Sequence, residues 1–256
     1  MLALLSPAKS LDFESPLPFP RRTQPRMLEE SAGLIDVMRE KSVAEIAKLM
    51  HISEELSTLN ASRYAAYDDE HTRKNSRPAA LAFNGDVYQG MQASQFDARD
   101  FTEAQKTLRI LSGLYGVLRP LDVIQPHRME MGTKLKTARG KTLYKWWGSR
   151  VTDQLKADLD ESPGTSVIVN LASNEYFGVV DTDRLGARVI SPRFEDRDED
   201  GKPRIVSFHA KRARGLMASW LVRNRVRTAS AVTDFEADGY IFDPTRSTKD
   251  TPIFVR

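Results

Sequence analysis

Short runs of hydrophobic residues along the chain predict buried strands, because strands covered on both faces read as continuous apolar stretches. Each run is followed by prolines, glycines or polar residues, which end a strand. The predicted strands are Leu2–Leu5, Ala79–Phe83, Leu108–Leu111, Ser166–Leu171, Tyr240–Phe242 and Ile253–Val255.

Helical periodicity dominates between Met27 and Tyr67, where apolar residues recur every three or four positions and fit three helices. Ser42 and Ser53 are predicted N-caps, and Glu45 completes a capping box with Ser42. Further helices are predicted to end at Phe101–Thr107 and to span Lys141–Leu159 and His209–Arg227. Because strands alternate with helices, the pattern predicts one α/β domain over residues 1–256, with a mixed, partly parallel sheet flanked by helices.

Two segments lack this regular spacing. Ser15–Arg26 carries four prolines, which predict an extended surface connection. Arg188–Phe194 and Arg204–Phe208 flank an acidic stretch with Asp200 and Gly201 in its turn, which predicts a hairpin.

Composition excludes several classes of protein. The chain is 40% hydrophobic and 29% charged, which is enough for a folded core, and the absence of cysteine excludes disulfides and thiolate chemistry. No apolar stretch approaches the ~18 residues of a membrane span, and the start lacks the features of a signal peptide. We therefore expect a cytoplasmic monomer without membrane contact. Nucleotide-binding, hydrolase and zinc signatures are absent and the four histidines are scattered, so no cofactor and no metal site are expected.

Positive charge is clustered although the net charge is only +3. Residues 104–150 hold ten Lys or Arg against two acids, and residues 201–233 hold eight against none. Clustered cations create a local field that attracts anionic partners, nucleic acid above all. In the second tract, Lys211, Arg212 and Arg214 lie beside the apolar stripe of a predicted helix. The alternative is a solvated helix face next to the acidic turn.

The segment Leu111–Gly132 is the main candidate for a binding site, because its glycines and prolines impose a shaped loop after a buried strand. Arg119 and Arg128 on this loop, with Lys9 after the first strand, offer donors to phosphate. The carboxyl ends of parallel strands are a common ligand position. The alternative is a surface crossover whose arginines pair with Asp122 and Glu130.

Candidate chemistry centres on Lys9, Asp122 and Glu175, where either carboxylate could serve as a general base. Ser173 has the alternative of a simple helix N-cap. The aromatic residues of this region either stack on bases or pack in the core. The residues expected to line the cleft are Ser6, Ser112, Tyr115, Asn170, Ser173 and Tyr176, and the aromatic residues in question are Tyr115, Tyr144, Trp146 and Trp147.

Seven blocks in order, SPAKS, FNGDVYQG, RILSGLYGVLRPLDVIQPHRMEMG, LYKWWG, VNLASNEYF, FHAKRARGLM and GYIFD, resemble the signature blocks of the YaaA family. The resemblance implies a peroxide-stress protein of the bacterial cytosol that limits free iron and protects DNA. It also implies an α/β domain with a basic cleft and a helix-hairpin-helix, which maps onto Val43–Tyr67. A fainter similarity, carried by Ser6, Lys9 and the LSxxYGxLxPxDxxxxP pattern from Ser112, points to enzymes that act on nucleoside N-glycosidic bonds.

The leading hypothesis is a DNA-binding stress protein that neutralises phosphates without reading sequence. An enzyme acting on a nucleotide or damaged base, with Lys9 and Asp122 meeting at strand ends, is the alternative. Iron sequestration would need a cluster of acids, and the stretch Glu195–Asp200 is predicted to be a solvated turn instead. The predicted phosphate contacts are Lys9, Arg119, Arg128, Lys211, Arg212 and Arg214.

Overall fold

The central sheet holds the first strand of the chain, β1 (Leu2–Leu5), at its middle. In the computed structural model, which describes residues 1–18 and 20–256, this sheet has the order β4-β3-β1-β6-β7. Strand β4 is antiparallel to β3, whereas β3, β1, β6 and β7 are mutually parallel. The predicted mixed, partly parallel sheet is therefore confirmed. The neighbours of β1 are β3 (Leu108–Ser112), β4 (Gly116–Leu118), β6 (Val167–Asn170) and β7 (Arg188–Ile190).

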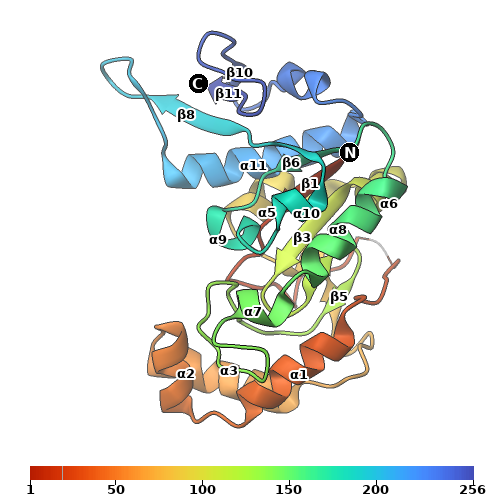
Figure 1. Cartoon of the computed structure of the whole chain (residues 1–256), viewed down its shortest axis with the longest axis vertical. Helices are drawn as coiled ribbons and strands as arrows, with labels where there is room; N and C mark the ends of the chain where they lie inside the picture. The colour runs from red at the N-terminus through yellow and green to blue at the C-terminus, as the bar shows by residue number, and fades with distance from the viewer. Residues whose placement is uncertain (19) are drawn as a thin grey trace.

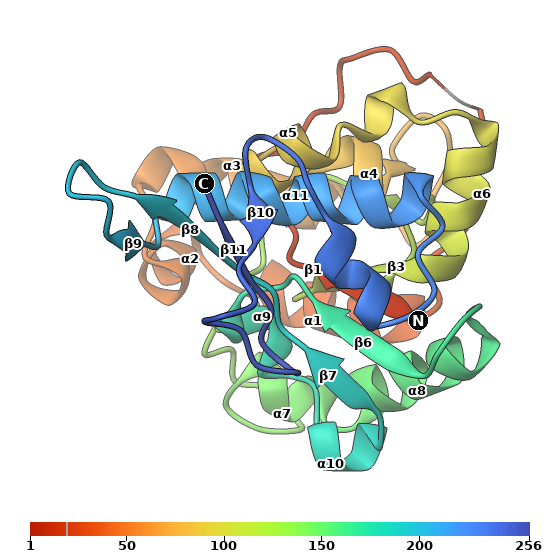
Figure 2. The same cartoon turned by 90° about the horizontal axis from the view of Figure 1, so that it is seen from above.

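Helices cover both faces of this sheet (Figure 2), with α5, α6 and α11 on one side and α7 and α8 on the other. Helices α1, α2 and α3 form the end of the molecule that lies lowest in Figure 1. The helices are α1 (Leu28–Arg39), α2 (Val43–Met50), α3 (Glu54–Ala66), α4 (Ala79–Ala82), α5 (Asp86–Met91), α6 (Ala98–Thr107), α7 (Leu143–Trp147), α8 (Arg150–Glu161), α9 (Asn174–Phe177), α10 (Thr182–Leu185) and α11 (Ser207–Arg223), with short 3₁₀ turns at Ala93–Gln95 and Ser230–Asp234.

Two smaller sheets complete the fold. The first has the order β10-β11-β8-β9 and lies beside α11 at the opposite end of the molecule from α2 (Figure 1). The second pairs β2 with β5. Their strands are β2 (Arg77–Pro78), β5 (Val123–Ile124), β8 (Arg193–Arg197), β9 (Pro203–Arg204), β10 (Ile241–Phe242) and β11 (Ile253–Val255).

The local signals at α2 and α3 act as predicted. Ser42 accepts a hydrogen bond from the backbone N–H of Glu45, and the Glu45 side chain accepts one from the Ser42 N–H, so the capping box is complete. Ser53 caps α3 by accepting from the N–H of Leu56. The link between the helices runs from His51, which has a left-handed backbone at φ 53°, to Ser53. The pair is an αα-hairpin without the glycines usual in a helix-hairpin-helix, and that motif stays a prediction.

Two secondary-structure predictions were wrong. Ala79–Phe83 was expected to be a strand, but Ala79–Ala82 forms helix α4. The stretch is buried on every side, so periodicity could not separate strand from helix, and alanine favours the helix. Lys141–Leu159 was expected to be one helix, but Gly148, at φ +52°, separates α7 from α8. Phe19, inside the predicted extended connection, lies outside the described residues.

The acidic stretch after Arg193 is only partly a turn. The hairpin between β8 and β9 is confirmed, with Asp196 opposite Arg204, whereas residues 188–190 form β7 in the central sheet instead. Glu195 was predicted to be solvated but is fully buried, with ion pairs to two arginines. No helix in the described part of the chain is long and apolar enough to span a membrane.

Candidate functional site

The carboxyl ends of β1, β3 and β6 come together on one edge of the central sheet. Since β1 lies between strands reached in opposite directions along the sheet, its carboxyl end is the switch point at which open α/β sheets bind ligands. Lys9 follows β1 and Ser112 ends β3. After β6, Ser173 donates its backbone N–H to the Ser6 hydroxyl at 2.9 Å, which ties the ends of two strands together.

A narrow pocket of about 10 Å³ lies at this edge, which is room for a single water molecule. Its charged groups centre on Glu130, whose Oε1 lies 3.0 Å from Lys9 Nζ and 3.1 Å from Arg128 Nη2. Lys9 is largely exposed, whereas the Arg128 and Glu130 side chains are mostly buried. The lining residues are Pro7, Ala8, Lys9, Phe83, Ser112, His127, Arg128, Met129, Glu130 and Tyr176.

His127 and Tyr176 are both neutral walls of the narrow pocket. Burial lowers the pKa of His127 to about 4, despite the backbone carbonyl of Gln125 that accepts from its Nδ1 at 2.8 Å. Since Nδ1 therefore carries the proton at neutral pH, Nε2 is an acceptor. Burial, followed by the charges of Glu175 and Glu130, raises the pKa of Tyr176 above its ordinary value.

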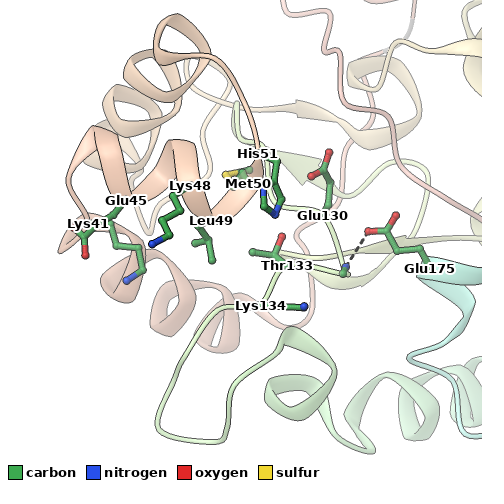
Figure 3. A pocket seen from close by; sticks show the side chains of 11 residues that line it. Lys41, Glu45, Lys48, Leu49, Met50, His51, Glu130, Thr133, Lys134 and Glu175 are labelled. Atoms are coloured by element: carbon green, nitrogen blue, oxygen red, sulfur yellow. Dashed lines mark hydrogen bonds between the residues drawn. The ribbon is translucent and has the colours of Figure 1, made fainter.

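A wide cleft of about 610 Å³ adjoins the narrow pocket and shares Glu130 with it (Figure 3). Helix α2 and its ends form one wall. The loop from Glu130 to Lys134, with Glu175 of α9, forms the other. The lining residues are Lys41, Glu45, Lys48, Leu49, Met50, His51, Glu130, Gly132, Thr133, Lys134 and Glu175.

Local sequence explains how each wall is built. Helix α2 buries Ile46 and Met50 against the core, which leaves Lys41 and Lys48, seven residues apart, on its cleft side. On the opposite wall the backbone N–H of Gly132 donates to Glu175 Oε1 at 2.9 Å. That contact fixes α9 to the loop.

The structure brings most of the predicted cleft residues to this edge. Ser6, Lys9, Ser112, Arg128, Ser173 and Tyr176 gather around the narrow pocket, and Glu175 lines the wide cleft. Ser173 also caps α9, so its alternative role is confirmed as well. Asn170 turns to the side, where its amide donates to the Ser191 hydroxyl at 3.4 Å.

Asp122 and Arg119 lie at the other end of β3. Strand β4 runs antiparallel to β3, with Leu118 opposite Ile110, so the chain has returned to the amino end of the sheet by residue 119. There Asp122 is fully buried, pairs with Arg119 at 2.8 Å and accepts from the Thr23 hydroxyl at 2.6 Å. Asp122 and Lys9 therefore do not share a site.

The basic residues of α11 lie outside both hollows. Lys211 reaches Asp86 at 3.7 Å, Arg212 reaches Asp238 at 3.7 Å, and burial lowers the pKa of Arg214. Lys211 lies nearest the site, since Gly85 beside Asp86 packs against Ala8. None of the three is among the described residues that line the narrow pocket or the wide cleft.

The aromatic residues expected to stack on bases mostly lie in the core. Tyr115 and Trp147 are fully buried, and Trp146 nearly so. Tyr115 bonds to His71 and to the backbone N–H of Gln125 in a buried polar cluster. Tyr144 is half-buried and donates to the Glu175 carbonyl at 2.7 Å.

Sequence reasoning missed the lysines of the wide cleft. Lys41 and Lys48 have a helical spacing that places them on one face, but the face that α2 turns to the cleft depends on packing against the core. Lys134 comes from a segment far away in the sequence. Glu130 was expected only as a partner of arginine, yet it borders both hollows. Among the described residues, no three His, Asp or Glu side chains are grouped so as to hold a metal ion.

Comparison with known proteins agrees along the whole chain. A family model described as peroxide stress protein YaaA matches residues 1–246. A UPF0246 protein of Tolumonas auensis is 52% identical over 256 residues, covering 100% of this chain and 98% of that protein. Relatives with the same description from Burkholderia mallei (strain SAVP1) and Marinomonas sp. are 50% and 49% identical over 100% of this chain and 98% and 97% of theirs. The chain belongs to the family of the peroxide stress protein YaaA.

Proposed function

We propose that this protein binds DNA during the peroxide stress response, with the wide cleft as its phosphate-binding surface. The family name supports the stress role, and the observation that carries DNA binding is the state of the cleft lysines. Lys41, Lys48 and Lys134 form no salt bridge with any residue that the structure describes, so their charges are available to phosphates.

The arginines predicted from sequence are less available. Arg119 and Arg128 are paired with Asp122 and Glu130, so binding a phosphate would first require breaking those contacts. Lys9 shares Glu130 with Arg128, although its exposure leaves room for a second anionic partner. We therefore assign the main phosphate contacts to the three cleft lysines, with Lys9 beside them.

Salt-dependent affinity tests this assignment. We expect the Lys41→Ala, Lys48→Ala double variant to bind a fluorescent 20-mer more weakly and to lower the slope of log affinity against log salt by about 2, one for each phosphate contact. The matched control is Lys106→Ala, Lys156→Ala, which removes the same charge from exposed helix positions outside the cleft. Equal slopes for the two double variants would refute the cleft as the DNA surface.

The limitation of free intracellular iron that the family resemblance implies belongs to the same proposal. We expect cells that produce only the Lys41→Ala, Lys48→Ala variant to suffer more DNA strand breaks after peroxide than cells with the natural protein. Chelatable iron measured by electron paramagnetic resonance in the same cultures separates the two roles. A rise in iron without a loss of DNA binding would show that they do not share the cleft.

A second candidate function is hydrolysis of an N-glycosidic bond in a nucleotide or damaged base, favoured by the place of Glu130. It lies at the switch point of the sheet, beside a pocket with room for one water. In that reaction Glu130 takes a proton from water, the water oxygen attacks the sugar carbon, and the base leaves with the bonding electrons and takes up a proton. Release of free base from oxidised oligonucleotides, lost in Glu130→Gln, is the expected result; no release with the natural protein would exclude it.

A further inference from the structure

The two walls of the wide cleft carry opposite charge (Figure 3). On the α2 wall, Lys41 and Lys48 face the cleft, while Glu45 is occupied by the backbone and hydroxyl of Ser42, each at 2.9 Å. On the facing wall stand Glu130 and Glu175. A ligand that fills this space must present negative charge to one side and hydrogen-bond donors to the other.

Each carboxylate of the acidic wall has one oxygen in use. Glu175 Oε1 accepts from the Gly132 N–H, and Glu130 Oε1 accepts from Lys9 and Arg128. The second oxygens, Oε2, have no hydrogen-bond partner among the residues that the structure describes. An ionised carboxylate is only an acceptor, so these oxygens call for N–H or O–H donors and repel phosphate.

A nucleotide has this polarity when its base carries an exocyclic amino group. Its phosphate suits the lysine wall, and the amino group of cytosine or adenine donates to a carboxylate, whereas thymine presents a carbonyl acceptor at the same place. The cleft volume of about 610 Å³ is that of a small-ligand site, so an unpaired nucleotide can enter and a duplex cannot.

We propose that the wide cleft selects an unpaired nucleotide with an amino-bearing base, cytosine or adenine, and that Glu175 Oε2 is the acceptor that reads it. The inference rests on the proposed DNA binding, since the lysine wall holds the phosphate. Glu175 is the exposed carboxylate of the two, and Gly132 holds its other oxygen in place.

Binding of labelled 12-mers of dC, dA and dT, measured by fluorescence anisotropy in 50 mM salt, tests the selection. We expect the natural protein to bind dC and dA about tenfold more tightly than dT, the scale of one good base contact. Glu175→Gln keeps an oxygen for the Gly132 N–H and places an amide donor where Oε2 was. It should therefore weaken dC binding and strengthen dT binding. The matched control, Glu199→Gln at the exposed tip of the β8–β9 hairpin, removes the same charge and should leave the ratios unchanged.

The outcomes separate this inference from the proposed function. Equal affinity of the natural protein for the three oligonucleotides overturns base selection, while salt-sensitive binding of all three keeps the phosphate cleft. An unchanged dC to dT ratio in Glu175→Gln also overturns the role of Glu175. Absence of binding to every oligonucleotide removes the proposed function and this inference together. The comparison within the natural protein needs no variant, so it holds even if a substitution disturbs folding.

Discussion

Replacing Gly215 with alanine should destabilise the protein although alanine favours helices. Gly215 lies in α11 where that helix crosses α5, and a Cβ at this position would stand 1.7 Å from the carbonyl oxygen of Val87 and 2.7 Å from the backbone nitrogen of Met91. Ordinary contact begins at 3.4 Å, so the two helix backbones would have to separate by about 1.7 Å, taken as 3.4 minus 1.7. Backbone atoms cannot rotate away as a side chain end can.

The magnitude follows from two opposed effects. Overpacking of a core contact costs about 3 kcal/mol at the upper end of its usual range, and the helix propensity of alanine over glycine returns about 1 kcal/mol. We therefore expect Gly215→Ala to lower the free energy of unfolding by about 2 kcal/mol or more. Urea unfolding followed by circular dichroism measures this difference.

Gly33→Ala in α1 is the matched control, because it makes the same change inside a helix but meets only the side chain of Trp146, at 3.0 Å. Its free energy of unfolding should change by less than about 1 kcal/mol, since the propensity gain offsets a small shift of the ring. If Gly215→Ala proved as stable as Gly33→Ala, the close crossing of α5 and α11 would not be a constraint, and the argument would fail.

Three further predictions concern buried charge and helix ends. Asp158→Asn should cost about 3 to 5 kcal/mol of stability, because the carboxylate lies 2% exposed between Arg26 and Arg109 and its removal leaves them buried without a counter-charge; urea unfolding at pH 7 measures this. His127 has its pKa lowered by burial to about 4, so the folded state resists protonation, and its stability, complete above the unfolded pKa of about 6.5, should fall by about 2 kcal/mol between pH 7 and pH 5; a His127→Gln variant with an unchanged pH dependence would contradict this. Ser42→Ala removes the cap of α2 and should cost about 1 kcal/mol, seen as a lower melting temperature, whereas an unchanged melting temperature would mean that packing alone holds the helix.

The sheet could be predicted where burial is uniform and the chain continues straight. Leu2–Leu5 and Ile253–Val255 are strands with the predicted bounds, since runs of large aliphatic or aromatic residues with β-branching leave little choice. Ala79–Ala82 is equally buried but made of small residues, and its helix became visible only in three dimensions. Burial therefore locates the core more reliably than it identifies the element.

The site was harder to predict because chain direction decides which polar groups meet. Residues 113–115 turn the chain after β3, and β4 carries Asp122 back to the amino end of the sheet. Without that reversal Asp122 would lie near Lys9, as the sequence suggested. The wide cleft combines Lys48 with Lys134, which lie on segments brought together only by tertiary packing, and no local pattern in either segment indicates the other.

Glycines of the blocks that resemble the YaaA family divide into two physical roles, which clarifies what those blocks specify. Gly90 and Gly215 let α5 and α11 touch, so FNGDVYQG and FHAKRARGLM specify helix packing there. Gly113 instead admits the carbonyl oxygen of Met129, which would lie 2.3 Å from an added Cβ, and Gly132 adjoins the Glu175 carboxylate. Since backbone contacts at both ends hold the loop between Met129 and Gly132, Glu130 is fixed where the narrow pocket meets the wide cleft. The arginine-rich helix thus contributes to the scaffold, and the selectivity of the site is expected to depend on the loop that positions the carboxylates.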